Sequence, residues 1–376
     1  MHTPHPLYIG MMSGTSLDGI DAVLAELGPD GETQLSGAVS APFSPSLRES
    51  LLALQTPSEN EIHREHLAAN ALAMAYADVV QQLLVKSKRH PSDIAAIGAH
   101  GQTIRHQAGS NIALAYTHQT LNPTLLAELT GIDVIADFRS RDLAAGGHGA
   151  PLVPAFHAQQ FASDKNTAVL NLGGIANLTL LPQKGDVTGF DCGPGNMLMD
   201  AWIAKHQGKA FDRDGAWAAQ GVVNDSLLER MLADPFFAKV PPKSTGRDDF
   251  HLQWLEKQLG GNALKAEDVQ ATLLRLTVTT ALQSIQVYAP QTEVLIICGG
   301  GINNTTLLNS LREQAQAMFK HGLEIQSSEA SGIDPQLVEA LAFAWLAWAY
   351  KTKRPANLPA VTGASGPRIL GACYPA

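Results

Sequence analysis

Short apolar runs alternate along the chain with longer segments in which apolar residues recur at helical spacing. Runs of this kind predict strands, and spacing that gathers apolar residues on one face predicts amphipathic helices. The predicted strands are residues 7–10, 19–25, 94–99, 133–136, 168–172, 175–181 and 294–298, and the predicted helices are residues 61–88, 121–129, 196–206, 215–233, 250–259, 267–288, 305–319 and 337–350. Strands that alternate with helices indicate an α/β architecture.

The pattern at the start of the chain returns in its second half. Residues 7–10 and 19–25 flank a turn rich in Gly, Ser and Thr, and residues 168–172 and 175–181 flank a Gly-Gly turn. The two hairpins lie roughly 160 residues apart, which is too far for a solenoid repeat. We therefore expect a duplicated α/β domain.

Length and charge narrow the class of protein. A chain of 376 residues is expected to form two domains, and 45% hydrophobic with 16% charged residues is typical of a folded globular protein. The net charge of −9 disfavours nucleic acid or an anionic membrane as partner. It leaves an anionic small ligand open, because backbone N–H groups bind phosphate without any net positive charge.

The cysteines and the termini predict a cytoplasmic protein. Cys192, Cys298 and Cys373 are widely spaced, which fits a reducing compartment, and the first residues do not form an export signal. The apolar run 337–350 is too short to cross a bilayer, so we expect a buried helix. Its Trp345 and Trp348 fit either the core or a homodimer interface, and the core is favoured.

The turn at residues 10–19 has the chemistry of a phosphate-binding loop. Glycines permit close backbone approach and hydroxyls add donors, here from Gly10, Gly14 and Gly19 and from Ser13, Thr15 and Ser16. Asp18 would then lie where a hydrated Mg²⁺ ion could bind. An ordinary Gly/Ser turn with a capping Asp fits the pattern equally well.

Two further turns carry candidate functional residues. Glycines and a proline around Asp191 predict a rigid turn, which suits a general base, although an N-cap or an ordinary turn residue before the next helix is an equal alternative. The turn Gly299, Gly300, Gly301 follows a buried strand, as in many nucleotide sites, but is often only structural. The sequence contains no P-loop motif and no H-E-x-x-H, and its 13 histidines show no metal spacing.

The segment 139–151 is rich in Gly and charge and is predicted to be a functional crossover between domains. Arg139 could order a sugar hydroxyl or carboxylate, whereas Arg139, Arg141 and Asp142 could equally form an interdomain salt bridge. Glu329 precedes a predicted helix and either caps that helix or binds a sugar hydroxyl.

Taken in order, these segments resemble the anhydro-N-acetylmuramic acid kinases, which belong with sugar kinases, acetate kinase, actin and chaperone ATPases. The matching blocks are residues 9–21, 100–106, 136–139, 146–157, 171–177, 190–196, 241–247, 299–301, 332–335, 339–345 and 362–366. The resemblance implies a two-lobed actin-like ATPase fold with ribonuclease H-like mixed sheets and an ATP cleft between the lobes. We expect lobes at 1–138, with 352–376 packed back on it, and at 139–351.

The resemblance also implies an activity and its residues. Such enzymes convert 1,6-anhydro-N-acetylmuramic acid, ATP and water into N-acetylmuramic acid 6-phosphate and ADP in peptidoglycan recycling, with Mg²⁺ as cofactor. Asp191 is implied as the catalytic base, and Asp18 as a water-mediated Mg²⁺ ligand. The implied ATP-binding residues are Met12, Ser13, Gly14, Thr15, Ser16, Leu17, Asp18, Gly19, Gly173, Gly174, Gly299, Gly300 and Gly301, and the implied substrate-binding residues are Arg139, Glu329, His100 and Gln102.

This chain departs from the family pattern at three places: Cys192 stands where Thr is expected, and residues 118–123 and 303–305 also differ. Three other functions share parts of the pattern. One is a kinase of the same fold that acts on an ordinary amino-sugar hydroxyl. Another is a non-enzymatic nucleotide or sugar sensor, which the presence of Asp191 disfavours because a sensor needs no catalytic base. A chaperone ATPase would need a peptide-binding domain, for which we expect no room.

Overall fold

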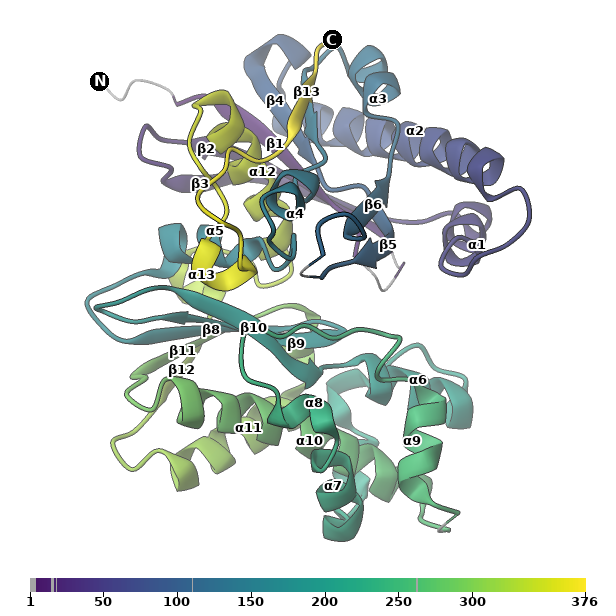
Figure 1. Cartoon of the computed structure of the whole chain (residues 1–376), viewed down its shortest axis with the longest axis vertical. Coiled ribbons are helices and arrows are strands. Elements are labelled where there is room, and N and C mark those ends of the chain that lie inside the picture. Colours follow the sequence, from purple (N-terminus) through teal and green to yellow (C-terminus); the bar gives the residue numbers. More distant parts are fainter. Residues whose placement is uncertain (1–4, 15–16, 18, 110, 262) are drawn as a thin grey trace. The chain divides into compact units, whose positions relative to one another are not determined.

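The computed structural model describes residues 5–14, 17, 19–109, 111–261 and 263–376. The chain forms two compact units (Figure 1): unit 1 is Met1–Gln160 with Leu337–Ala376, and unit 2 is Phe161–Gln336. The bounds expected from the sequence place the crossover segment 139–151 and the apolar helix near residue 345 in the second lobe. In the structure both belong to unit 1. The physical reason is packing, because that helix lies against the central strands of unit 1.

Unit 1 is built on a six-stranded sheet in the order β13-β7-β4-β1-β2-β3. Its strands are β1 (Leu7–Met12), β2 (Gly19–Leu27), β3 (Thr33–Pro42), β4 (Ile94–Ala99), β7 (Val134–Ala136) and β13 (Ala372–Tyr374). β1, β2 and β3 form an antiparallel meander, and β4 and β7 run parallel to β1. A separate hairpin joins β5 (Gln102–Gln107) and β6 (Tyr116–Thr120).

Unit 2 is built on a five-stranded sheet in the order β10-β9-β8-β11-β12. Its strands are β8 (Thr167–Leu172), β9 (Ile175–Leu181), β10 (Thr188–Pro194), β11 (Val294–Cys298) and β12 (Glu324–Ser327). β8, β9 and β10 form an antiparallel meander, and β11 and β12 run parallel to β8.

The two sheets therefore share one topology. In each, three meander strands occupy positions 3-2-1, and two later strands extend the sheet parallel to the first, which is the ribonuclease H-like arrangement. The duplication expected from the two hairpins is confirmed, since β1–β2 and β8–β9 are equivalent hairpins. The predicted α/β class with two mixed sheets is likewise confirmed.

The helix α12 (Val338–Lys351) forms the centre of unit 1. It crosses β1 and β4 where both strands have glycine, because a Cβ atom on Gly10 or Gly98 would overlap the backbone of α12. Trp345 and Trp348 are 6% and 3% exposed, so this apolar helix is part of the core of the unit. The other helices of the unit are α1 (Pro45–Ala53), α2 (Glu61–Ser87), α3 (Pro123–Thr130), α4 (Ser140–Ala144), α5 (Val153–Phe161), α13 (Pro359–Thr362) and the short 3₁₀ turn η1 (Pro91–Asp93).

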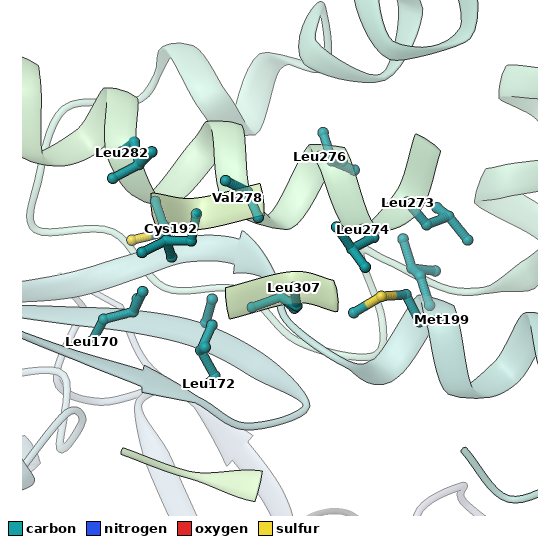
Figure 2. Close-up of a cluster of buried hydrophobic side chains, with 14 of the residues drawn as sticks. Leu170, Leu172, Cys192, Met199, Leu273, Leu274, Leu276, Val278, Leu282 and Leu307 are labelled. Carbon is teal, nitrogen blue, oxygen red and sulfur yellow. The ribbon is translucent and has the colours of Figure 1, made fainter. Parts of the chain in front are cut away.

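The core of unit 2 lies between its sheet and the long helix α10 (Ala266–Tyr288). Figure 2 shows Cys192 of β10 beside Val278 and Leu282 of α10, with Leu170 and Leu172 of β8 in the same cluster. The other helices are α6 (Met197–Gln207), α7 (Asp225–Leu232), α8 (Pro235–Ala238), α9 (Leu252–Leu259) and α11 (Thr305–Met318), with 3₁₀ turns η2 (Arg213–Gly215), η3 (Ala218–Gln220), η4 (Gly300–Asn303) and η5 (Ser328–Ser331).

One predicted helix is wrong over its first half. The pattern at 215–233 predicts a continuous helix, but only α7 is helical beyond two 3₁₀ turns. Gly221 has extended backbone angles, and a Cβ atom there would overlap the carbonyl of Glu267. The next residue, Val222, donates its N–H to Asp268 Oδ1 at 2.7 Å. The chain runs extended here because it must pass close to the start of α10.

Within the described part of the chain, every helix is too short or too polar to cross a membrane.

A buried carboxylate fastens the crossover segment to the last residues of unit 1. Asp142 has no solvent exposure, and it accepts hydrogen bonds from the backbone N–H of Gly149 at 2.8 Å, from Asn357 Nδ2 at 2.7 Å and from Thr362 Oγ1 at 2.8 Å. All four residues belong to unit 1. The hydrogen bonds of Asp142 therefore hold unit 1 together, instead of forming the salt bridge between domains that the sequence also allowed.

We expect Asp142→Ala to destabilise unit 1 by on the order of 3 kcal/mol, because three buried donors would lose their acceptor. Urea unfolding followed by circular dichroism would show the lowered midpoint. Asp78→Ala is the matched control, since Asp78 is exposed on α2. Equal midpoints for the two variants would contradict the assigned role of Asp142.

Candidate functional site

The candidate residues of unit 1 gather at one edge of its sheet. β1, β4 and β7 are parallel, and each is followed directly by a predicted site segment: the loop after Met12, His100 and Arg139. Ligands of α/β proteins bind beyond the carboxyl ends of parallel strands. The topology therefore brings together segments that are far apart in the sequence.

The described part of the loop after β1 is held firmly by its own unit. Ser13 is buried, and its hydroxyl lies 2.9 Å from Tyr76 Oη and donates to the carbonyl of Gly101 at 3.0 Å. Gln102 donates from Nε2 to the carbonyl of Gly14 at 3.2 Å. The Ser13 hydroxyl and the Gln102 amide thus support the described part of the loop.

Other residues of this loop have mixed outcomes. Thr15, Ser16 and Asp18 lie outside the described residues. Leu17 is buried with a positive φ of 58° and donates its N–H to the carbonyl of Gly14 at 3.2 Å. Met12 ends β1, and Gly19 begins β2, where a Cβ atom would overlap the carbonyl of Ala41. The absence of a side chain at Gly19 is therefore explained by the packing of β2 on β3.

Arg139 and His100, both predicted from the sequence, lie in direct contact. The guanidinium donates from Nε and Nη2 to His100 Nε2 at 3.2 and 2.9 Å, and from Nη1 to the carbonyl of Gly149 at 2.9 Å. Burial, and then the charge of Arg139, lower the pKa of His100 well below its usual value, so the imidazole is neutral. Burial lowers the pKa of Arg139 to about 10, and nearby Glu339 and Asp142 oppose that shift.

His106, which was not predicted as a site residue, lies near the same arginine and near His148. His106 Nδ1 lies 3.0 Å from Thr117 Oγ1. Burial, followed by the charges of Arg139 and His148, lowers the pKa of His106 to about 4. Near neutral pH the charged Arg139 therefore lies with the neutral rings of His100 and His106, which suits an anionic ligand group. His106 and His148 fall within blocks that resemble the kinase family, which was the available signal.

The candidate residues of unit 2 also gather at the carboxyl edge of their sheet. The parallel strands β8, β11 and β12 are followed by Gly173, by Gly299 and by the 3₁₀ turn that contains Glu329. In both units, therefore, the predicted residues follow the carboxyl ends of the parallel strands.

Strand register aligns three polar residues across unit 2. Asn171 of β8 pairs with Asn177 of β9, which in turn pairs with Asp191 of β10. Directly paired residues point to the same face of a sheet, so the three side chains form one polar row. Cys192 follows Asp191 and points into the core beside α10 (Figure 2). A register shift after Asp191 then ends this alignment.

The Gly-Gly turn of unit 2 is fixed by the segment that follows Asp191. Gly195 donates its N–H to the carbonyl of Gly174, and Asn196 donates its N–H to the carbonyl of Gly173, both at 2.9 Å. Asn196 also donates from Nδ2 to the carbonyl of Leu172 at 2.9 Å. α6 begins at Met197 with Asn196 as its N-cap residue, so the alternative in which Asp191 caps that helix is wrong.

The Gly299–Gly301 turn packs against the same hairpin. Gly299 has a φ of 83°, and a Cβ atom there would overlap the Asn171 side chain. A Cβ atom on Gly301 would lie 2.6 Å from Leu172 Cβ, whereas one on Gly300 would meet nothing within 4 Å. The turns after β8, β10 and β11 therefore form one closely packed backbone surface, which only glycine allows at Gly299 and Gly301.

Asp191 is held by a segment that the sequence analysis did not place in the site. The backbone N–H of Asp191 donates to the carbonyl of Lys243 at 3.1 Å, and the N–H of Thr245 donates to Asp191 Oδ2 at 2.9 Å. Burial raises the pKa of Asp191 to about 7, although the Thr245 N–H and the Lys243 charge lower it. A carboxyl group with this pKa can accept a proton near neutral pH, as a general base must. The signal for Lys243 and Thr245 was their place in the matching block 241–247.

Glu329 remains at the edge of the unit 2 site. Its side chain is exposed and accepts a hydrogen bond from Ser327 Oγ at 3.3 Å, while its N–H donates to the same hydroxyl at 3.1 Å. Ser327 is thus the N-cap residue of the 3₁₀ turn and Glu329 lies within that turn, so the alternative in which Glu329 caps a helix is wrong. Glu329 follows β12 on the same edge as the glycine turns, and its role toward a sugar stays a prediction.

A cavity of about 710 Å³ also lies in unit 2. Phe211 and Trp217 are among its lining residues, as is Asp214. The carbonyl of Asp214 accepts a hydrogen bond from Thr306 Oγ1 at 2.9 Å, so the cavity adjoins the start of α11, shortly after the glycine turn. Within the described ranges, no group of three or more His, Cys, Asp or Glu side chains could hold a metal ion.

Comparison with known proteins identifies the family of the chain. The family profile described as anhydro-N-acetylmuramic acid kinase matches residues 6–376. Curated anhydro-N-acetylmuramic acid kinases from Ralstonia nicotianae and Nitrosomonas europaea are 52% and 51% identical to the chain. Each comparison covers 98% of this chain, and 97% and 99% of the respective relatives. The chain therefore belongs to the anhydro-N-acetylmuramic acid kinase family.

Proposed function

We propose that this chain is an ATP-dependent kinase of 1,6-anhydro-N-acetylmuramic acid. It opens the anhydro bridge with water, phosphorylates O6, and releases N-acetylmuramic acid 6-phosphate and ADP for peptidoglycan recycling. The kinase activity rests on the family and on relatives that carry that name. The observation that supports the hydrolytic step is Asp191, a carboxyl group with a pKa of about 7 at the end of a polar row.

The chemistry of the substrate requires two linked events. In the anhydro sugar O6 is bonded to C1, so there is no free 6-hydroxyl for a phosphoryl group. Asp191 removes a proton from a water molecule, and the water oxygen attacks C1 from the face opposite the bridge. The C1–O6 bond breaks, its electron pair stays on O6, and O6 takes the γ-phosphoryl group of ATP. The anomeric carbon is inverted.

The contacts of Asp191 suit this role. The Thr245 N–H fixes Oδ2, so Oδ1 is the oxygen to which we assign the proton from water. The carboxylate must be ionised to act, and its pKa of about 7 places that ionisation within the working range of pH. We therefore expect kcat/KM to rise with pH through about 7 and then to level off.

We assign ATP binding to the loop from Met12 to Gly19 in unit 1, of which residues 15, 16 and 18 lie outside the described residues. In unit 2 we assign it to Gly173, Gly174 and the closely packed Gly299–Gly301 turn. We assign the nucleoside to the adjoining cavity, where Phe211 and Trp217 offer aromatic faces.

Mg²⁺ fits this site only as an ion that ATP carries. The described chain has no cluster of metal ligands, whereas a hydrated Mg²⁺ bound to phosphates needs only one or two carboxylates. Asp18, the residue predicted to hold it, lies outside the described residues. When bound, the ion would neutralise charge on the phosphates.

We assign the carboxylate of the sugar acid to Arg139. Near neutral pH its guanidinium is charged, whereas His100 and His106 are neutral because their pKa values are lowered. His100 and Gln102 then act by holding Arg139 and the loop, and Glu329 remains a proposed contact of a sugar hydroxyl.

The first prediction concerns the linked reaction. Incubation with ATP, Mg²⁺ and the anhydro sugar in ¹⁸O-water should place label on the anomeric oxygen and none on the phosphate, as measured by mass spectrometry. Asp191→Asn should lower kcat by at least about 10³-fold and retain ATP binding, because only the base is lost.

Unlabelled product kept in ¹⁸O-water for the same time controls for exchange at the anomeric position. A kinase of an ordinary sugar hydroxyl would instead phosphorylate N-acetylmuramic acid and incorporate no label beyond that control. Near-normal turnover by Asp191→Asn would remove Asp191 as the base.

The second prediction concerns the sugar acid. Arg139→Met should raise KM for 1,6-anhydro-N-acetylmuramic acid by about 10²-fold, because a charged hydrogen-bonding partner of the carboxylate is lost. The variant should change KM little for 1,6-anhydro-N-acetylglucosamine, which lacks the carboxylate. Steady-state kinetics with both sugars would test the assignment, and an equal loss for both would contradict it.

The third prediction separates two neighbouring glycines. Gly299→Ala should weaken ADP binding by more than tenfold, because a positive φ and overlap with Asn171 would displace the turn. Gly300→Ala is the matched control and should bind ADP nearly normally, since its Cβ atom would meet nothing within 4 Å. Isothermal titration calorimetry gives both affinities. Equal affinities would show that the turn does not contact the nucleotide.

A further inference from the structure

Lys243 is a buried cation beside the proposed base. Its side chain belongs to a residue only 8% exposed, in the segment that follows two prolines after α8. Lysine is rarely buried to this extent unless a carboxylate pairs with it directly. Hydrophobic packing therefore does not explain why a charged residue occupies this buried position.

Aromatic rings surround the ammonium group of Lys243. Nζ lies 4.9 Å from the ring centroid of Phe236 and 5.9 Å from that of Phe190, and it donates to the carbonyl of Phe237 at a long 3.5 Å. Cation–π attraction offsets part of the cost of removing the charge from water. Burial still lowers the pKa of Lys243, so the charged form is held at a cost.

The backbone around Lys243 holds Asp191 from two directions. The carbonyl of Lys243 accepts the N–H of Asp191 at 3.1 Å, and the N–H of Thr245, two residues later, donates to Asp191 Oδ2 at 2.9 Å. Thr245 is itself tied by its hydroxyl to Asp249 Oδ2 at 2.7 Å. Residues 243–245 thus hold both β10 and the Asp191 carboxylate. The same segment carries the ammonium group of Lys243.

We infer that Lys243 is a positioning residue for the reaction: its caged ammonium supplies the positive charge that keeps the Asp191 carboxylate ionised enough to accept a proton from water. The inference rests on the proposed role of Asp191. In this inference Lys243 acts on the substrate only through Asp191. A methionine would fill the same space without the cost of a buried charge. A lysine at this position is therefore explained by the effect of its charge on Asp191.

The other charged and titratable groups around this pair support the assignment to Lys243. On β10, Cys192 points into the core, and burial raises its pKa to about 12, so it stays a neutral thiol. Tyr288 of α10 contacts Phe190 edge-on. Lys239, which follows α8, is exposed and lies 5.7 Å from the Phe236 centroid. Lys243 is therefore the buried cation to which we assign this effect: its carbonyl binds the Asp191 N–H, and its charge lowers the pKa of the Asp191 carboxyl.

The test compares pH profiles of kcat/KM for Lys243→Met, Lys243→Arg and Lys239→Met. Removal of the charge should shift the acidic limb upward by about one pH unit, so that Lys243→Met is about tenfold slower than wild type below pH 6 and nearly equal above pH 9. Lys243→Arg should keep the wild-type limb, because the cation–π cage accepts a guanidinium. Lys239→Met should also keep it, since an exposed charge is screened.

Two further measurements keep the inference testable if turnover is absent. The pKa of Asp191 can be read without substrate from a ¹³C-aspartate NMR titration, with Asp191→Asn to assign the signal, and Lys243→Met should raise that pKa. Thermal unfolding should show Lys243→Met at least as stable as wild type, because a poorly paired buried charge is removed.

The inference is overturned if Lys243→Met is slower at every pH with an unmoved limb and an unmoved NMR pKa, or if its profile equals that of wild type. If Lys243→Met does not fold, Lys243→Leu takes its place with the same readouts. A wild-type enzyme that leaves the anhydro sugar unchanged would refute the proposed function, while the NMR titration would still decide the role of Lys243.

Discussion

The register of one antiparallel meander decides the position of the proposed base. Backbone pairing of β8, β9 and β10 aligns Asn171, Asn177 and Asp191 on one face of the unit 2 sheet. Slipping one strand by a single residue would turn Asp191 into the core and Cys192 out of it. The apolar side of the same strands prevents such a slip, because Leu170, Leu172 and Cys192 are buried against α10. The site is therefore positioned by the hydrophobic core on the opposite face of the sheet.

Both units contain charged side chains that are buried. Asp142 and Arg139 in unit 1, and Asp191 and Lys243 in unit 2, are all removed wholly or partly from water. Asp142 is fully supplied with donors, which fits a structural role. Asp191 and Lys243 have fewer side-chain hydrogen bonds among the described residues, and their pKa values are displaced toward neutrality from opposite sides. Displaced pKa values of this kind are typical of functional groups more than of structural ones.

In both units the candidate residues lie at the carboxyl ends of the parallel strands, but the residues themselves differ between the units. In unit 1 the edge carries a backbone loop supported by Ser13 and Gln102, together with a cationic cluster around Arg139. In unit 2 the equivalent edge carries glycine turns and a carboxylate. We propose that backbone of both units binds phosphate, and we assign the acid–base chemistry to unit 2 and the recognition of the anionic sugar to unit 1.

The sequence by itself determined the α/β class, the duplicated hairpins, the central apolar helix and the family, because hydrophobic periodicity and local turn residues are written in short stretches of chain. It also identified Asp191, Arg139 and His100 as candidates. It did not reveal that Arg139 contacts His100, that Asp142 fastens the crossover to the last residues of unit 1, or that the chain at Gly221 is extended.

Those features depend on residues that are distant in the sequence. Lys243 shows this most clearly, since nothing in its immediate neighbours predicts that Phe190 and Phe236 enclose its ammonium group or that its carbonyl binds Asp191. Only the tertiary structure sets the distances and the burial that displace a pKa, because solvent exclusion is a property of the packed core and not of any segment of chain.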